Sequence, residues 1–218
     1  MSFPTWQEAA ESEFWEKLPQ DLHEQAVTDY LGSNGDAIDG RVQNLIGLAD
    51  TLYKGGHHGP SIVASVIALE VMIHYFCVRP IIVGAVLSDL IAAEVSKRIV
   101  GSRTSDQRQM LSAVLRPWGI ELSHLLLPDK QPLWDRIQNV VIRKRDGFIH
   151  RGDEVTSEEA ELALQCVRSF HDQVVLGLAH RLGFTLQLSG CWSKIVDAAR
   201  PPGYLGGERG YTRVNPFA

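Results

Sequence analysis

The apolar run from residue 61 to residue 78 constrains the fold of this chain more than any other feature. A run of this length can cross a membrane as a helix, but a helix that is apolar on all sides also occurs at the centre of a bundle. Glu70 and His74 lie inside the run, and ionisable groups are costly in hydrocarbon. We therefore expect a buried central helix and no membrane contact. Glu70 and His74 are expected to form a buried, hydrogen-bonded pair, with Glu70 in a structural role.

Helical spacing of apolar residues, punctuated by Gly and Pro, continues along most of the chain. No alternation typical of a sheet and no internal repeat is visible. The sequence therefore predicts an all-α helical bundle. The predicted helices cover residues 5–17, 20–31, 38–54, 60–79, 81–100, 106–116, 132–151 and 156–182, with a turn at 32–36.

Residue composition and the apolar pattern divide the chain into three parts. Residues 1–36 are predicted to be an N-terminal helical extension, residues 37–183 the bundle, and residues 184–218 an irregular arm rich in Gly and Pro. The arm carries Arg and Tyr side chains that suit either contact with RNA or packing on the bundle, and packing is the favoured interpretation. These side chains are Arg200, Arg209, Arg213, Tyr204 and Tyr211.

Composition limits the classes of function. The formal net charge of −5 excludes bulk, non-specific binding of polyanions, so any contact with nucleic acid has to come from a local patch. Cys77, Cys166 and Cys191 are widely spaced, which is typical of free thiols in a reducing cytoplasm. The first 17 residues are acidic and lack the pattern of a signal peptide. We therefore expect a cytoplasmic protein.

The stretch "VIRKRDGFIHRGDEVTSEEAE", residues 141–161, joins the two clearest amphipathic helices. Gly152 is placed to end the first helix as a C-terminal cap. Thr156 and Glu159 have the spacing of a capping box that starts the second. Residues 136–151 hold five basic residues and one acid, a charge of +4 that leaves −9 for the remaining residues. Cations at the end of a helix often do no more than complement its dipole.

An arginine and a histidine in this basic segment also suit chemistry on a phosphodiester. Arginine offers a planar, permanently charged fork to a phosphate, and histidine transfers protons near neutral pH. On an ideal helix Arg145 and His150 lie about 140° apart, whereas Arg143 lies within about 20° of His150. Arg145 and His150 of one helix therefore do not converge on one small group, but two copies of the helix facing each other would bring both residues to one cleft.

The segment "RDGFIHRGDEVTSEEAELALQCVRSF" resembles the C-terminal helix pair of the HEPN superfamily. The family signature is an arginine, usually followed by a polar residue, and then a histidine, and Arg145, Asp146 and His150 match it in order. Arg143 with His150 satisfies its loosest form. The resemblance extends to the apolar run that contains Glu70. It implies an α-helical bundle that dimerises, and in many members a metal-independent endoribonuclease of toxin–antitoxin, anti-phage or RNA-processing systems.

These considerations give each candidate residue a role. His150 is expected to be the general acid or base, Arg145 to bind the scissile phosphate, and Asp146 to orient one of them. The expected substrate-binding residues are Arg143, Lys144 and Arg151. No metal-ligand set or cofactor motif is visible, so neither a metal nor a cofactor is expected. The expected partners are an RNA substrate, a second copy of the chain, and an antitoxin or defence-system protein.

Two alternatives remain open. Some HEPN-like proteins are catalytically silent and bind a nucleotide or a partner protein. The chain could also be a structural helical scaffold with a decorated surface.

Overall fold

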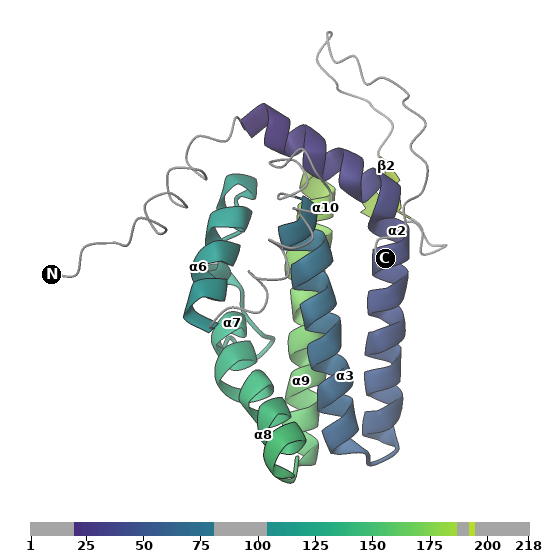
Figure 1. Cartoon of the computed structure of the whole chain (residues 1–218), viewed down its shortest axis with the longest axis vertical. Helices are drawn as coiled ribbons and strands as arrows, with labels where there is room; N and C mark the ends of the chain where they lie inside the picture. Colours follow the sequence, from purple (N-terminus) through teal and green to yellow (C-terminus); the bar gives the residue numbers. More distant parts are fainter. Residues whose placement is uncertain (1–19, 81–103, 187–191, 195–218) are drawn as a thin grey trace, which may run out of the picture.

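A computed structural model describes residues 20–80, 104–186 and 192–194, and it confirms an all-α helical fold. The predicted helices at 5–17 and 81–100 lie outside the described residues. Figure 1 shows long helices running side by side along the length of the molecule. The helical elements are α2 (Gln20–Lys54), α3 (His58–Val71), η1 (Met72–Val78), α6 (Thr104–Leu115), η2 (Arg116–Trp118), η3 (Leu122–His124), α7 (Leu133–Arg136), η4 (Ile137–Ile142), α8 (Arg143–Arg151), α9 (Ser157–Phe170), η5 (His171–Val175) and α10 (Leu176–Arg181).

Helix α2 is continuous through residues 32–36, where the sequence predicts a turn, so that prediction is wrong. The side chains of Ser33 and Asn34 donate hydrogen bonds to carbonyls four residues earlier, at 2.9 and 3.0 Å. Gly32 lies against the ring of the buried Phe184. Tertiary packing thus overrides the weak helix propensity of these residues, and the expected boundary between residues 36 and 37 falls inside one helix. The helix bends along its length (Figure 1), as helices with Gly and Ser residues often do.

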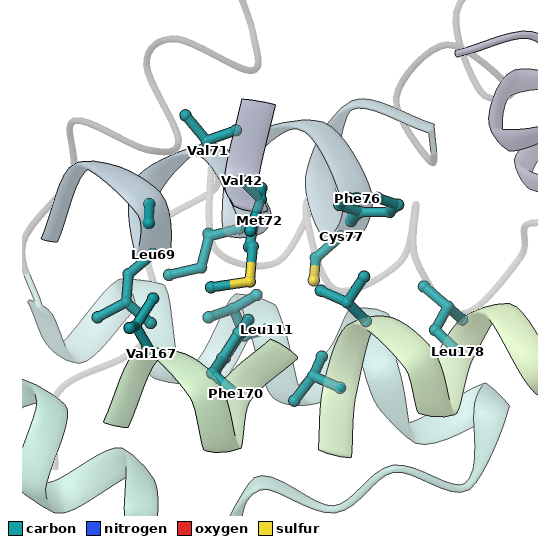
Figure 2. Packing of buried hydrophobic residues seen from close by; sticks show 14 of the residues in the cluster. Val42, Leu69, Val71, Met72, Phe76, Cys77, Leu111, Val167, Phe170 and Leu178 are labelled. Carbon is teal, nitrogen blue, oxygen red and sulfur yellow. The ribbon is translucent and has the colours of Figure 1, made fainter. Parts of the chain in front are cut away.

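The core is built around α3 and η1, as the apolar run predicts. Helix α3 packs against both α2 and α9. Figure 2 shows Met72 and Phe76 of η1 in one cluster with Leu111 of α6 and Phe170 of α9, and all four side chains are buried. Within the described residues, His58–Val78 is the one helical run long and apolar enough to cross a membrane, but 72% of its most apolar window is buried in the bundle. A buried core helix has this property as well.

The last two predicted helices are present, although each changes its winding along its length. α7, the π-helical η4 and α8 follow one another without a break, and α9, the π-helical η5 and α10 do the same. Gly152 ends α8 with a left-handed φ of 71°, a conformation that glycine adopts without strain. The predicted capping box starts α9, since the Glu159 backbone N–H donates to Thr156 Oγ1 at 3.3 Å and the Thr156 N–H donates to Glu159 at 3.0 Å.

The beginning of the expected irregular arm forms a small hairpin. Strand β1 (Phe184–Leu186) pairs antiparallel with β2 (Trp192–Lys194), with Phe184 opposite Lys194. The hairpin contacts α10 and α2. The arginines and tyrosines of the arm that suit an RNA contact lie outside the described residues. Cys77 and Cys166 are free, buried thiols, and burial raises the pKa of each to about 12.

Candidate functional site at the end of α8

Helix α8 lies at the end of the bundle opposite α10 and β2 (Figure 1). It is fixed there by contacts with α3 and with α9. The Phe148 ring sits directly on Gly59 of α3, so closely that a Cβ atom on Gly59 would overlap it. Lys144 reaches α9, where its ammonium pairs with Glu159 at 2.6 Å. The positions of the candidate site residues are therefore set by two neighbouring helices.

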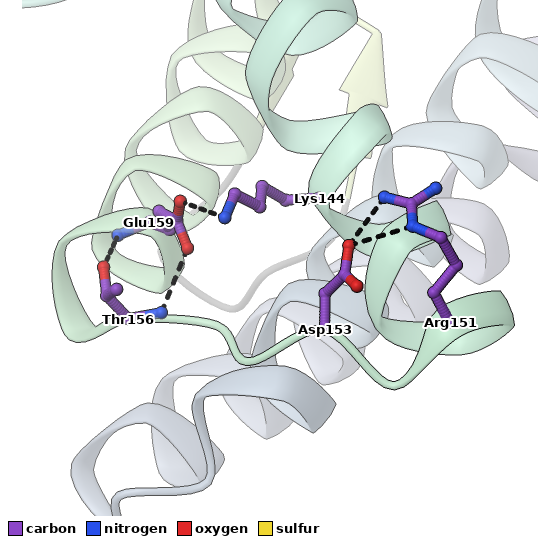
Figure 3. A network of polar contacts seen from close by, with 5 residues as sticks. All are labelled: Lys144, Arg151, Asp153, Thr156 and Glu159. Carbon is purple, nitrogen blue, oxygen red and sulfur yellow. Dashed lines mark hydrogen bonds and ion pairs between the residues drawn. The ribbon is translucent and has the colours of Figure 1, made fainter.

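Two of the three expected substrate-binding cations are held by carboxylates of the same chain (Figure 3). The Lys144 ammonium contacts Glu159, the capping-box residue of α9. The Arg151 guanidinium donates from Nε and Nη2 to Asp153 Oδ2, at 3.1 and 2.6 Å. Its pKa is raised by that hydrogen bond. Lys144 and Arg151 thus stabilise the end of α8 and the start of α9, and their charges are already matched.

Arg145 lies between two carboxylates. Its Nη2 donates to Glu70 Oε1 on α3 at 3.0 Å. Its Nε lies 2.9 Å from Asp146 Oδ1, an ion pair whose angle is poor for a hydrogen bond. These contacts leave Nη1 and its two N–H donors without a partner among the described residues. Asp146 therefore contacts Arg145, one of its two predicted partners.

The prediction that Glu70 is buried and pairs with His74 is wrong. The Glu70 side chain is 48% exposed, and its charge is matched by Arg145. The apolar run encloses Glu70 in sequence, but Glu70 lies on the edge of α3 that faces the first turn of α8. An ion pair at the surface satisfies the carboxylate there without burial.

His150 is exposed, and no hydrogen bond or ion pair joins it to another residue that the structure describes. Because α8 is a regular α-helix from Arg143 to Arg151, the ideal angle of about 140° between Arg145 and His150 applies. The two signature residues therefore project from different sides of α8. Ile149 on α8 and Ile67 on α3 are 49% and 38% exposed, which leaves apolar surface beside His150 and beside Glu70.

Arg143 is exposed and, in contrast to the other three cations of α8, has no ion-pair partner within the described ranges. It lines a pocket of about 330 Å³ where α6, α7, η4 and α8 meet. Arg108 and Asp135 line the same pocket and pair with each other at 3.1 Å. Trp134, Gln138 and Asp146 also line this pocket.

A second cluster of titratable groups, which the sequence did not reveal, lies inside the bundle. The buried His171 on η5 places Nε2 2.8 Å from Oδ1 of the buried Asp39 on α2. Its Nδ1 lies 3.2 Å from Asp172 Oδ1, and the Gln43 amide lies 3.1 Å from Nε2. Burial alone would lower the pKa of His171, but the hydrogen bonds to Asp39 and Asp172 outweigh it and raise the pKa above its usual value.

Comparison with known proteins adds no relative: no family model, no curated protein and no solved structure matches this chain. In the part of the chain that the structure describes, no three His, Cys, Asp or Glu side chains come together as a metal site.

Proposed function

We propose that the chain is a metal-independent endoribonuclease of the HEPN type that works as a homodimer. The observation that carries the proposal is the arrangement on α8. Arg145 is held in place by Glu70 and Asp146, while His150 is exposed on the same helix, and neither Arg145 Nη1 nor the His150 imidazole has a partner among the residues that the structure describes. A fixed cation and an accessible imidazole are the two groups that cleavage of RNA without a metal requires.

In this proposal the ribose 2′-hydroxyl attacks the adjacent phosphorus and the P–O5′ bond breaks. His150 accepts the proton of the 2′-hydroxyl, and the imidazolium that forms gives a proton to the departing O5′. The free Nη1 donors of Arg145 stabilise the charge that develops on the non-bridging oxygens. The products are a 2′,3′-cyclic phosphate and a 5′-hydroxyl. DNA lacks the nucleophile and is not cleaved.

A second copy of the chain follows from the divergence of Arg145 and His150 on one helix. Two α8 helices that face each other bring Arg145 of one subunit near His150 of its partner. The exposed Ile67 and Ile149 offer apolar surface beside these groups for such a contact. A toxin–antitoxin or anti-phage defence role remains part of the proposal.

The test is incubation of the purified protein with single-stranded and loop RNA in EDTA, with the matching DNA in parallel. RNA alone should be cleaved. His150→Ala should lower the rate ~100- to 10,000-fold, and Arg145→Ala should lower it ~100- to 1,000-fold. His180→Ala, at an exposed histidine of α10, and Arg168→Ala, at an exposed arginine paired with Asp50, are matched controls that should keep full activity. Cleavage that survives both site substitutions, or that needs added Mg²⁺, would contradict the proposal.

The alternative is a catalytically silent module that binds a nucleotide or a partner protein. One observation favours it: the two carboxylates beside Arg145 already neutralise its charge. Binding of RNA or nucleotide by the wild-type protein with no cleavage of any RNA would support this alternative over the ribonuclease.

A further inference from the structure

The pocket next to Arg143 contains polar groups that nothing in the described protein satisfies. Both amide atoms of Gln138 and the indole Nε1 of Trp134 are buried and lack a hydrogen-bond partner among the described residues. Trp134 is only 2% exposed, and both side chains line the pocket. Buried polar groups are nearly always paired in folded proteins, so three unpaired atoms on two residues that line one pocket point to a ligand that these side chains would shift to meet.

The charges of the pocket point to an anionic group on that ligand. Arg108 is neutralised by Asp135, and Asp146 shares the Arg145 guanidinium with Glu70. This leaves Arg143 as the one lining cation without a carboxylate partner in the described part of the chain. An unpaired guanidinium at the rim of a pocket is suited to a phosphate.

The unpaired atoms of the wall match a nucleobase. The Gln138 amide offers both donors and an acceptor, and the Trp134 indole offers one donor, which is the kind of set that reads the edge of a splayed-out base. The volume of about 330 Å³ is near the lower end for small-ligand pockets, about 300–1,000 Å³. Gln138 also lies in η4, a π-helical segment, and such segments are frequent at functional sites.

We propose that this pocket is a subsite for one nucleotide of single-stranded RNA, with its base against Gln138 and Trp134 and its phosphate on Arg143. Gln138 is only half-buried, so its amide turns into the pocket when a base offers partners. Arg143 and His150 share one face of α8, and seven residues of helix separate them by roughly 10 Å along the axis. A polymer spans this gap and a free mononucleotide does not. The subsite rests on the proposed ribonuclease function, since it positions the strand that His150 cleaves.

The experiment measures binding and cleavage separately. Binding of fluorescein-labelled eight-nucleotide RNA homopolymers is followed by anisotropy in the full-length His150→Ala protein, with AMP, CMP, GMP and UMP titrated in parallel. Arg143→Gln should weaken RNA binding and reduce the slope of log K against log salt by about one. Gln138→Leu should raise the melting temperature, because it removes unpaired buried atoms, yet reduce the preference among bases on the order of tenfold. Arg116→Gln and Gln165→Leu, which change residues outside the pocket, should alter neither binding nor base preference.

The possible outcomes separate the two proposals. A more stable Gln138→Leu protein with unchanged base preference, together with an unchanged salt slope for Arg143→Gln, would sink the subsite even if the wild type cleaves RNA. Pocket-dependent binding of RNA without any cleavage by the wild type would sink the ribonuclease and leave the subsite standing. Binding of mononucleotides as tightly as RNA would overturn RNA as the occupant.

Discussion

The Arg145 guanidinium reaches from α8 to Glu70 on α3, with Nη2 3.0 Å from Oε1. The two residues are 75 positions apart in the sequence, so this ion pair connects α3, the central helix of the bundle, to α8. Both side chains are partly exposed, and exposed ion pairs contribute little to stability, about 0–1 kcal/mol. The pair therefore matters mainly for where the guanidinium is held.

Glu70→Gln is predicted to lower kcat by up to about 100-fold while leaving KM nearly unchanged, because a guanidinium displaced by about 1 Å stabilises the transition state poorly. The free energy of unfolding should change by less than about 1 kcal/mol. Steady-state kinetics measure kcat and KM, and urea melts measure the free energy of unfolding. Asp50→Asn breaks another exposed carboxylate–arginine pair, with Arg168, and should leave kcat intact. Equal losses of kcat in the two variants would argue against a positioning role for Glu70.

Mixing two inactive variants tests whether a site is shared between subunits. Arg145→Ala and His150→Ala proteins, unfolded together and refolded, should recover roughly a quarter of wild-type activity, because half of the dimers are mixed and each mixed dimer keeps one intact site. Each variant refolded alone should stay inactive. No recovery in the mixture, with dimers present by light scattering, would place the whole site in one chain.

Ile149→Asp is predicted to dissociate the proposed dimer and abolish the proposed cleavage, because a charge in an apolar contact is desolvated without a partner. Leu48 on α2 is 50% exposed, nearly the same as Ile149, so Leu48→Asp is a matched control that should remain a dimer. Sedimentation velocity gives the oligomeric state of both proteins. An active Ile149→Asp monomer would rule out this face as the interface.

Gly59→Ala is predicted to destabilise the protein by ~1–3 kcal/mol, since the new methyl group overlaps the Phe148 ring. Activity should fall as well, because α8 has to move away from α3. Phe148→Leu in the same chain should restore part of both losses by making room. Gly40, on α2, has open space where a Cβ would be placed, so Gly40→Ala should be neutral or stabilising. Thermal melts and cleavage rates are measured on these proteins. Equal losses of stability and activity in Gly40→Ala would show that overlap with Phe148 is not the cause.

The His171 cluster predicts a pH-dependent stability. Since the pKa of His171 is raised in the folded protein, its stabilising contribution is complete below the unfolded pKa of about 6.5 and is lost as pH rises through the folded value. His171→Gln should cost about 3–5 kcal/mol, because it leaves Asp39 buried without its partner. Asp172→Asn removes the exposed carboxylate partner of His171. It should reduce the pH dependence of the unfolding free energy less than His171→Gln does. Urea melts from pH 5.5 to 9 measure this, and His180→Gln is the exposed control.

Local sequence patterns predicted the parts of the fold that local forces determine. The C-terminal cap at Gly152 and the capping box of Thr156 and Glu159 depend on residues within one turn, and both are present. The divergence of Arg145 and His150 followed from helix geometry alone. The turn at 32–36 was wrongly predicted because the ring that packs on Gly32 comes from Phe184, far along the chain.

The remaining errors have the same origin. A run of apolar neighbours indicates that a helix is central, but it does not say which edge of that helix meets α8, so Glu70 was expected to be buried. Asp39 and His171 lie 132 positions apart, and neither has a local signature. The pocket at Arg143 is formed by residues of α6, α7, η4 and α8. The spacing of residues in the sequence does not indicate that these elements pack against one another.

The separation of Asp39 from His171 also sets an order of events during synthesis of the protein. At about 5–20 residues per second, the ribosome adds the 132 intervening positions in roughly 7–26 s. Throughout this interval the nascent α2 carries a carboxylate destined for the interior but lacking its imidazole. Helix α8 is translated before α9, against which it is fixed, and both precede His171 in the chain. The end of the molecule that carries His150 therefore takes its final form only after α9 has been translated.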